Sequence, residues 1–210
     1  MVRLSLLLLA VLVADPARAA PAVPSYLSRL EAQVLAELNH VREAPRSYAA
    51  ALGELRKHYR GRLLELPGQV PLMTVEGAAA LDEAVRALRA SPALPRFLCS
   101  PGMSRAARGH AEDIGPRGLT SHVGSRGTDP FRRLQCCGTW EGAAGENIQY
   151  GGRDAREVVV QLLIDDGVPG RGHRKNVLSS RFRVVGVGCG RHARFRTVCV
   201  IDFAAGYRER

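Results

Sequence analysis

The chain has 210 residues, of which 46% are hydrophobic and 24% are charged, and its formal net charge at pH 7 is +10. This hydrophobic share is enough for the core of one ordinary domain. No segment reaches the roughly 20 consecutive apolar residues that a bilayer-spanning helix needs. We therefore expect a mature protein without a membrane span.

Nearly all of the positive charge is arginine, because Lys57 and Lys175 are the only lysines. The arginines are scattered, which is compatible with attraction to anionic surfaces such as cell-wall polymers, lipid headgroups or nucleic acid, and equally with a solvated basic surface. Aromatic residues make up only 5% of the chain and do not alternate with basic ones. Nucleic-acid binding is therefore not expected.

The first 20 residues have the pattern of a secretory signal peptide. Arg3 precedes an apolar run over residues 6–13, and the segment closes on Ala17-Arg18-Ala19. We expect cleavage there and a secreted protein, either extracellular or in the periplasm or cell envelope. A retained N-terminal anchor is the alternative. Residues 21–206 are expected to form a single domain.

The N-terminal half has mainly helical spacing. A first helix is predicted from Ser25 to the residue before Pro45, since its apolar residues recur at helical intervals. A second helix is expected over residues 46–59, a loop over 61–71 and a third helix over 74–89. Residues 101–114 predict another helix and 115–127 a glycine-rich loop. A short helix follows, with Pro130 in its first turn, ending near residue 136.

The C-terminal half changes character. A brief extended segment is expected over residues 146–150, and Asp154 begins a helix that ends near residue 165. Residues 182–189 and 197–204 are rich in valine and predict an antiparallel hairpin. Helices beside a small, mainly antiparallel sheet define the α+β class.

Five cysteines are present, and export would permit disulfides. Cys189 and Cys199 flank the link of the predicted hairpin, so a cross-strand bridge is expected between them. A second pairing, of Cys99 with Cys136 or Cys137, is also open. The odd number leaves at least one thiol unpaired within a monomer.

Polar residues that can carry chemistry lie beside glycines or turns in the second half. They are His122, Glu146 and His173, and imidazoles with a carboxylate can ligate a metal or exchange protons with a substrate. His173 precedes a helix-like segment, and the dipole at a helix start favours the neutral imidazole. Asp165 and Asp166, at the end of an apolar helix, could add a further carboxylate.

Each of these residues also has a structural interpretation. A histidine on a loop can serve only as a hydrogen-bonded scaffold residue, and Glu146 could form an ion pair with Arg174. The two aspartates could be a hydrated helix end. His110, on a predicted helix, is interpreted as structural.

Several catalytic motifs are absent from the sequence. It has no His-Glu-x-x-His helix, no phosphate-binding glycine loop and no Gly-x-Ser-x-Gly nucleophile elbow. It has no Cys-x-x-Cys pair either, so a zinc ribbon is not indicated.

Four motifs in order nevertheless resemble the CAP superfamily, also called the SCP domain, and in particular its bacterial secreted members. They are Ser121-His122-x-Gly124-Ser125, Gly145-Glu146-Asn147-Ile148, Gly172-His173-Arg174-x-Asn176 and the glycine- and valine-rich hairpin. The resemblance covers residues 99–206 strongly and the N-terminal helix more loosely. It implies a three-layer α-β-α sandwich.

The resemblance also implies a central cleft with two histidines and two acidic residues. His122, Glu146 and His173 match three of them, and Asp165 is taken as the fourth, with Asp166 as the alternative. A metal, zinc being the expectation, would then be held by His122 and His173. Arg126 occupies a position where related sequences often have an acid, and its charge would oppose a bound metal.

For function, the resemblance suggests a secreted binding or interaction module that takes up a divalent metal and lipid or cell-envelope ligands. The alternative is a metal-dependent, peptidase-like hydrolase using the same cleft. A structural envelope protein with a vestigial cleft is the third hypothesis.

Overall fold

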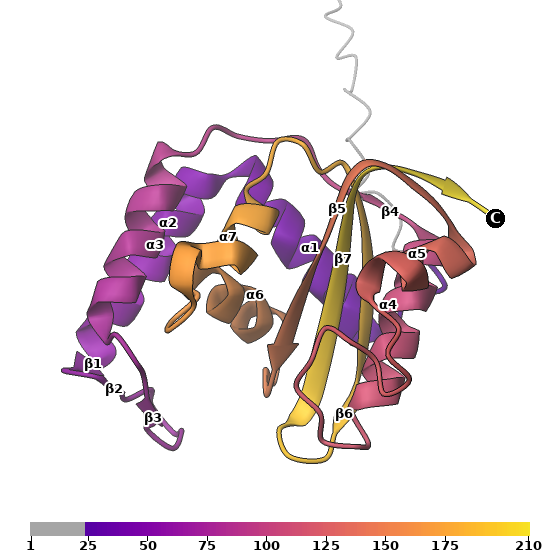
Figure 1. Cartoon of the computed structure of the whole chain (residues 1–210). Helices are drawn as coiled ribbons and strands as arrows, with labels where there is room; N and C mark the ends of the chain where they lie inside the picture. The colour runs from indigo at the N-terminus through magenta and orange to yellow at the C-terminus, as the bar shows by residue number, and fades with distance from the viewer. Residues whose placement is uncertain (1–23) are drawn as a thin grey trace, which may run out of the picture.

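The computed structural model describes residues 24–210, so the predicted signal peptide lies outside the described residues. Its centre is a four-stranded sheet with the order β4-β6-β7-β5 (Figure 1). The strands are β4 (Leu98–Cys99), β5 (Gly138–Tyr150), β6 (Val184–His192) and β7 (Arg196–Glu209). β4 pairs with β6 in parallel and the other pairs are antiparallel. β5 is therefore an edge strand of the sheet.

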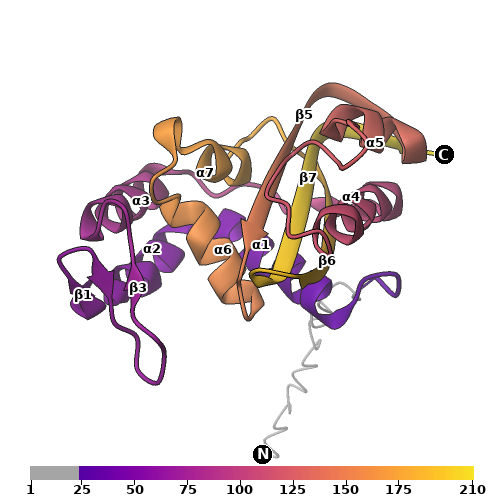
Figure 2. The ribbon, with the colours of Figure 1, turned by 60° about the horizontal axis from the view of Figure 1, so that its bottom comes forward.

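Helices cover both faces of this sheet, as Figures 1 and 2 show. On one face lie α4 (Pro101–Ile114) and α5 (Pro130–Cys137), and on the other lie α1 (Arg29–Glu43), α6 (Ala155–Ile164) and α7 (Gly172–Val177). Beyond these last helices lie α2 (Pro45–Gly53) and α3 (Ala78–Ala90). The arrangement is the predicted α+β fold in three layers, α-β-α.

Alternation along the strands divides the core between the two faces. On β7, Val198 and Val200 pack beside α4 together with Ile148 of β5, whereas Ile201 and Phe203 face the larger cluster that contains α1 and α6. Successive strand side chains point to opposite faces. Asp202 consequently points to the α4 and α5 face, although its two neighbours are core residues of the other face.

The predicted hairpin is confirmed, and both of its strands continue beyond their predicted ends. β5 is also longer than the predicted segment 146–150, and its pairing with β7 is irregular between Glu141 and Ala144. The predicted disulfide joins Cys189 to Cys199, which are directly opposite one another on β6 and β7. Cys99, Cys136 and Cys137 are free thiols, so the second pairing is not formed.

The N-terminal half differs from expectation in detail. The first helix begins at Arg29, because Ser28 rather than Ser25 caps it in a capping box with Glu31. The second helix ends at Gly53 and continues as the 3-10 turn η1 (Glu54–His58). The predicted loop instead contributes to a three-stranded sheet of β1 (Tyr59–Arg60), β2 (Leu63–Leu64) and β3 (Leu72–Met73).

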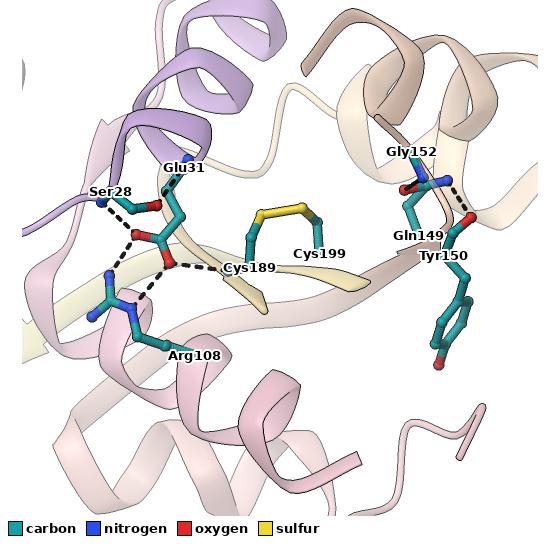
Figure 3. Close-up of a disulfide and its surroundings, with 8 residues drawn as sticks. All are labelled: Ser28, Glu31, Arg108, Gln149, Tyr150, Gly152, Cys189 and Cys199. Atoms are coloured by element: carbon teal, nitrogen blue, oxygen red, sulfur yellow. Dashed lines mark hydrogen bonds and ion pairs between the residues drawn. A yellow bond between two sulfur atoms is a disulfide. The ribbon is translucent and has the colours of Figure 1, made fainter. Parts of the chain in front are cut away.

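Glu31 joins three elements at the disulfide (Figure 3). Its buried carboxylate accepts hydrogen bonds from the Arg108 guanidinium, from the backbone N–H of Cys189 and from that of Ser28. Burial raises the pKa of Glu31, but these donors outweigh it and leave the pKa below its usual value. These hydrogen bonds hold α1 against α4 and β6.

Among residues 24–210, none of the helices is long and apolar enough to cross a membrane.

Candidate functional site

His122 lies on the loop between α4 and α5, and its ring contacts Glu146 of β5. The His122 Nδ1 atom is 2.7 Å from Glu146 Oε1. The imidazole side chain is 52% exposed, whereas the Glu146 side chain is only 1% exposed. An ionised carboxylate only accepts hydrogen bonds, so Nδ1 is the donor and Nε2 remains on the open side of the ring.

The second oxygen of Glu146 is occupied by an arginine that the sequence did not single out. Arg133, on α5, donates from Nη2 to Glu146 Oε2 at 2.6 Å and from Nη1 to the carbonyl of Thr128 at 2.7 Å. The alternative ion pair of Glu146 with Arg174 is wrong. Arg174 bonds to Glu83 and to the carbonyl oxygens at the end of α6.

A second acidic residue lies next to Glu146, on the neighbouring strand β7. Asp202 is directly opposite Glu146 in the register of β5 and β7, and it is fully buried. Neither of its side-chain oxygens has a hydrogen-bond partner among the described residues. Burial raises the pKa of Asp202 well above its usual value, and the charge of Glu146 raises it further.

His173 begins α7 and forms the second histidine–carboxylate pair. Its Nδ1 atom is 2.6 Å from Asp165 Oδ1, and Asp165 Oδ2 accepts from the backbone N–H groups of His173 and Arg174 at 3.0 and 3.3 Å. Asp165 ends α6 in the left-handed conformation, with φ of 56°. Asp166 instead accepts from the N–H groups of Val75 and Glu76. Of the two aspartates, the geometry pairs Asp165 with the histidine.

The two pairs flank the edge strand β5. Glu146 points to the α4 and α5 face, while the next residue, Asn147, points to α7. Asn147 donates to the carbonyl of His173 at 3.0 Å and accepts from the side chain of Asn176 at 2.8 Å. Adjacent residues of one edge strand therefore anchor both histidine pairs.

The structure thus brings the four predicted residues together as two pairs. Within residues 24–210, no three His, Cys, Asp or Glu side chains gather into a group that could hold a metal ion. Both oxygens of Glu146 and both oxygens of Asp165 already have donors. On each ring only Nε2 remains for a metal, with the carboxylate orienting the ring from behind.

Arg126, whose charge was expected to oppose a metal at His122, is not the cation that contacts the His122–Glu146 pair. Arg133 is the guanidinium on Glu146, whereas Arg126 makes no hydrogen bond or ion pair with the part of the chain that the structure describes. No local signal in the sequence pointed to Arg133. It is one of two adjacent arginines on a short helix, and only the packing of α5 against β5 selects it.

A larger hollow, of about 830 Å³, lies between α3 and the segment that leads into α7. Arg171 and Arg174 line it, and both pair with Glu83. None of the four predicted site residues lines this hollow.

Comparison with known proteins agrees with the motif order. The model of the Cysteine-rich secretory protein family (CAP) matches residues 83–203. The uncharacterized protein YkwD of Bacillus subtilis (strain 168) is 31% identical over 86 residues, which cover 41% of this chain and 32% of that protein. The chain thus spans about a third of the length of this relative.

Two solved structures are similar in part. An extracellular protein containing a SCP domain from Bacillus anthracis str. Ames has a TM-score of 0.44 and 25% identity, with 53% of this chain and 34% of that chain covered. An outer surface protein from Borrelia burgdorferi has a TM-score of 0.45 and 15% identity, with 78% of this chain and 93% of that chain covered.

Proposed function

The chain belongs to the Cysteine-rich secretory protein (CAP) family, and from this premise we propose that it is a secreted ligand-binding module whose binding groups are His122 and His173. The main support for this proposal is the arrangement of the two imidazoles. Each imidazole has its Nδ1 atom bonded to a buried carboxylate, so each keeps Nε2 for a ligand.

This arrangement prepares the rings for binding. A carboxylate at Nδ1 fixes the tautomer with the proton on Nδ1 and holds the ring orientation. Glu146 and Asp165 are therefore orienting groups rather than direct ligands. The oxygens of both carboxylates already accept hydrogen bonds from the protein, so they are not available to bind a ligand.

A divalent metal such as zinc is the first ligand to test. His122 and His173 would hold it through Nε2, and a metal bound there would polarise an oxygen ligand as a Lewis acid. Two imidazoles are fewer than the three protein ligands usual in catalytic zinc sites. We therefore expect weak binding that leaves room for groups from another molecule.

Lipid or cell-envelope polymers are the proposed larger ligands. The net charge of +10, spread over many arginines, favours anionic surfaces of this kind outside the cytoplasm. This part of the proposal depends on charge and on the predicted export.

A hydrolase is the second candidate, favoured by the same pairs, since an imidazole oriented by a buried acid is a competent general base. The two serines near His122 do not support covalent catalysis. Ser121 Oγ accepts from the N–H of Val123, and Ser125 Oγ bonds to Asp113. Water would be the nucleophile. If hydrolysis of casein, peptidoglycan or ester substrates survives Glu146→Gln unchanged, Glu146 has no role in proton transfer.

Calorimetric zinc titration tests the binding proposal directly. The wild type should bind zinc, and the double variant His122→Ala/His173→Ala should lose the heat of binding. His58→Ala is the matched control, because it removes an imidazole from η1, away from both pairs. Equal isotherms for the wild type and the double variant would overturn the assignment of the metal to these residues.

A further inference from the structure

A small cavity of about 260 Å³ lies beside the His122–Glu146 pair, against α4 and the loop that follows it. Residues lining it include Gly109, His110, Asp113, Gly124, Arg126 and Arg133. Neither His122 nor His173 lines it. The cavity is therefore distinct from the proposed binding groups, although Arg133 also contacts Glu146.

His110 presents an unused acceptor to this cavity. It is 1% exposed, and its Nε2 atom is 2.9 Å from the carbonyl oxygen of Ser121. A carbonyl oxygen only accepts hydrogen bonds, so Nε2 carries the proton. Burial lowers the pKa of His110 and the charge of Arg133 lowers it further, so the ring is neutral and Nδ1 is an acceptor. This buried Nδ1 has no hydrogen-bond partner among the described residues.

Two arginines supply donors to the same space. The Nε atom of Arg133 is buried and has no partner within residues 24–210, although both terminal nitrogens of this guanidinium are bonded. Arg126 lines the cavity and makes no hydrogen bond or ion pair with the described residues. The site therefore combines one acceptor with two sets of donors.

The charge balance leaves the cavity positive. Asp113 also lines it, but its carboxylate accepts from the N–H and hydroxyl of Ser125 and pairs with Arg117. Arg133 is balanced by Glu146. Arg126 has no counter-charge within the described part of the chain, so a ligand with a single negative charge suits the cavity best.

Gly124 keeps the space in front of His110 open. A Cβ atom at this position would lie 3.0 Å from Asp113 Oδ2 and 3.9 Å from His110 Nδ1. A side chain there would therefore reduce the cavity at its acceptor end.

We propose that this cavity binds a phosphate group that retains a proton, either inorganic phosphate or a phosphate monoester. The P–OH would donate to His110 Nδ1, and the other oxygens would accept from Arg133 Nε and from the Arg126 guanidinium. The inference goes beyond the proposed function, because it names a second site and a different ligand. Charge-assisted bonds from arginine to phosphate oxygens are among the strong hydrogen bonds in proteins.

Sulfate is the discriminating probe. It has nearly the size and shape of phosphate but carries no proton near neutral pH, so it would leave His110 Nδ1 facing an oxygen lone pair. An unpaired buried acceptor of this kind should weaken binding about tenfold or more. A site that only attracts negative charge would bind the doubly charged sulfate at least as well.

The experiment is calorimetric titration of the full mature chain at pH 7 and low salt with inorganic phosphate, sulfate and glycerol phosphate. We expect phosphate to bind about tenfold or more tightly than sulfate, and Arg126→Gln to weaken phosphate about tenfold. Arg181→Gln is the matched control, since Arg181 is another exposed arginine without an ion pair in the described region. Gly124→Ala should also weaken binding without removing a charge.

The two phosphate probes separate the sources of the ligand. Tighter binding of glycerol phosphate identifies a phosphate monoester, and tighter binding of inorganic phosphate identifies the free ion. Equal affinities for phosphate and sulfate, or equal losses in Arg126→Gln and Arg181→Gln, would overturn the proposal. No binding of either phosphate probe at millimolar concentration would also overturn it. Zinc binding at His122 and His173 should be unchanged in Arg126→Gln, which keeps this test separate from that of the proposed function.

Discussion

The two histidine–carboxylate pairs lie on either side of β5, but their acids are held in different ways. Asp165 bonds to two backbone N–H groups at the start of α7, so this acid is part of the backbone structure. Glu146 is held by side chains, with Arg133 on one oxygen, His122 on the other and Asp202 opposite on β7. One pair is built by backbone geometry and the other by charge, so mutation and pH should affect them differently.

The largest expected effect is on the backbone-held pair. Asp165→Ala should lower the free energy of unfolding by about 2–4 kcal/mol, because it leaves the N–H groups of α7 without an acceptor and puts alanine in the left-handed conformation. Asp165→Asn is the matched variant, since asparagine tolerates this conformation and keeps one side-chain acceptor. Urea unfolding should show a clearly smaller loss for Asp165→Asn. Equal losses would contradict the backbone role.

The next effect concerns the charge-held pair. Arg133→Leu should lower the free energy of unfolding by about 2–3 kcal/mol at pH 7, because Glu146 then remains buried without its cation. Arg132→Leu is the control, because the side chain of Arg132 is mostly exposed. Similar losses in the two variants would show that Arg133 does not neutralise Glu146.

Asp202→Asn should stabilise the protein at neutral pH by about 1–2 kcal/mol. The folded pKa of Asp202 is raised, so the folded state keeps a proton that the unfolded state releases above about pH 4. Stability from this group is thus fully present below about pH 4 and falls by about 1.4 kcal/mol per pH unit until the folded pKa is reached. The variant should lack this slope in urea unfolding from pH 4 to 8. Parallel pH profiles would show that the pKa of Asp202 is not raised in the folded state.

The smallest effects are expected from the imidazoles. His122→Ala and His173→Ala should each change the free energy of unfolding by less than about 1 kcal/mol, because the His122 ring is half exposed, the His173 ring is partly exposed and Asp165 keeps its backbone donors. Thermal unfolding measures this. A large loss in either variant would mean that the histidine is structural, which was the alternative interpretation from the sequence.

Local sequence signals predicted much of the framework. Valine-rich runs predicted the hairpin, and the spacing of Cys189 and Cys199 predicted its disulfide. Asp154 does cap α6, as its position before an apolar run suggested. The third predicted helix begins four residues late, at Ala78, because Gly77 adopts a φ of 66° just before it.

The environment of the candidate site could not be predicted in the same way. Asp202 meets Glu146 only through the register of β5 and β7, which are far apart in the sequence. Arg133 reaches Glu146 only because α5 packs on β5. In contrast, Asp165 and His173 are only eight residues apart in the sequence. The sequence therefore indicated an aspartate near His173, but the choice between Asp165 and Asp166 depended on the backbone geometry between α6 and α7.

The tautomers of the imidazoles decide whether Nε2 of His122 and of His173 can accept a ligand. Nitrogen–proton correlation NMR near pH 8 distinguishes a proton on Nδ1 from one on Nε2. We predict the Nδ1–H form for His122 and His173, and the Nε2–H form for His110, whose Nε2 faces a carbonyl oxygen, as the internal reference. Glu146→Gln should remove the preference at His122 alone. The Nε2–H form at His122 or His173 in the wild type would contradict the account, because the ring would then have no lone pair at Nε2 to offer a ligand.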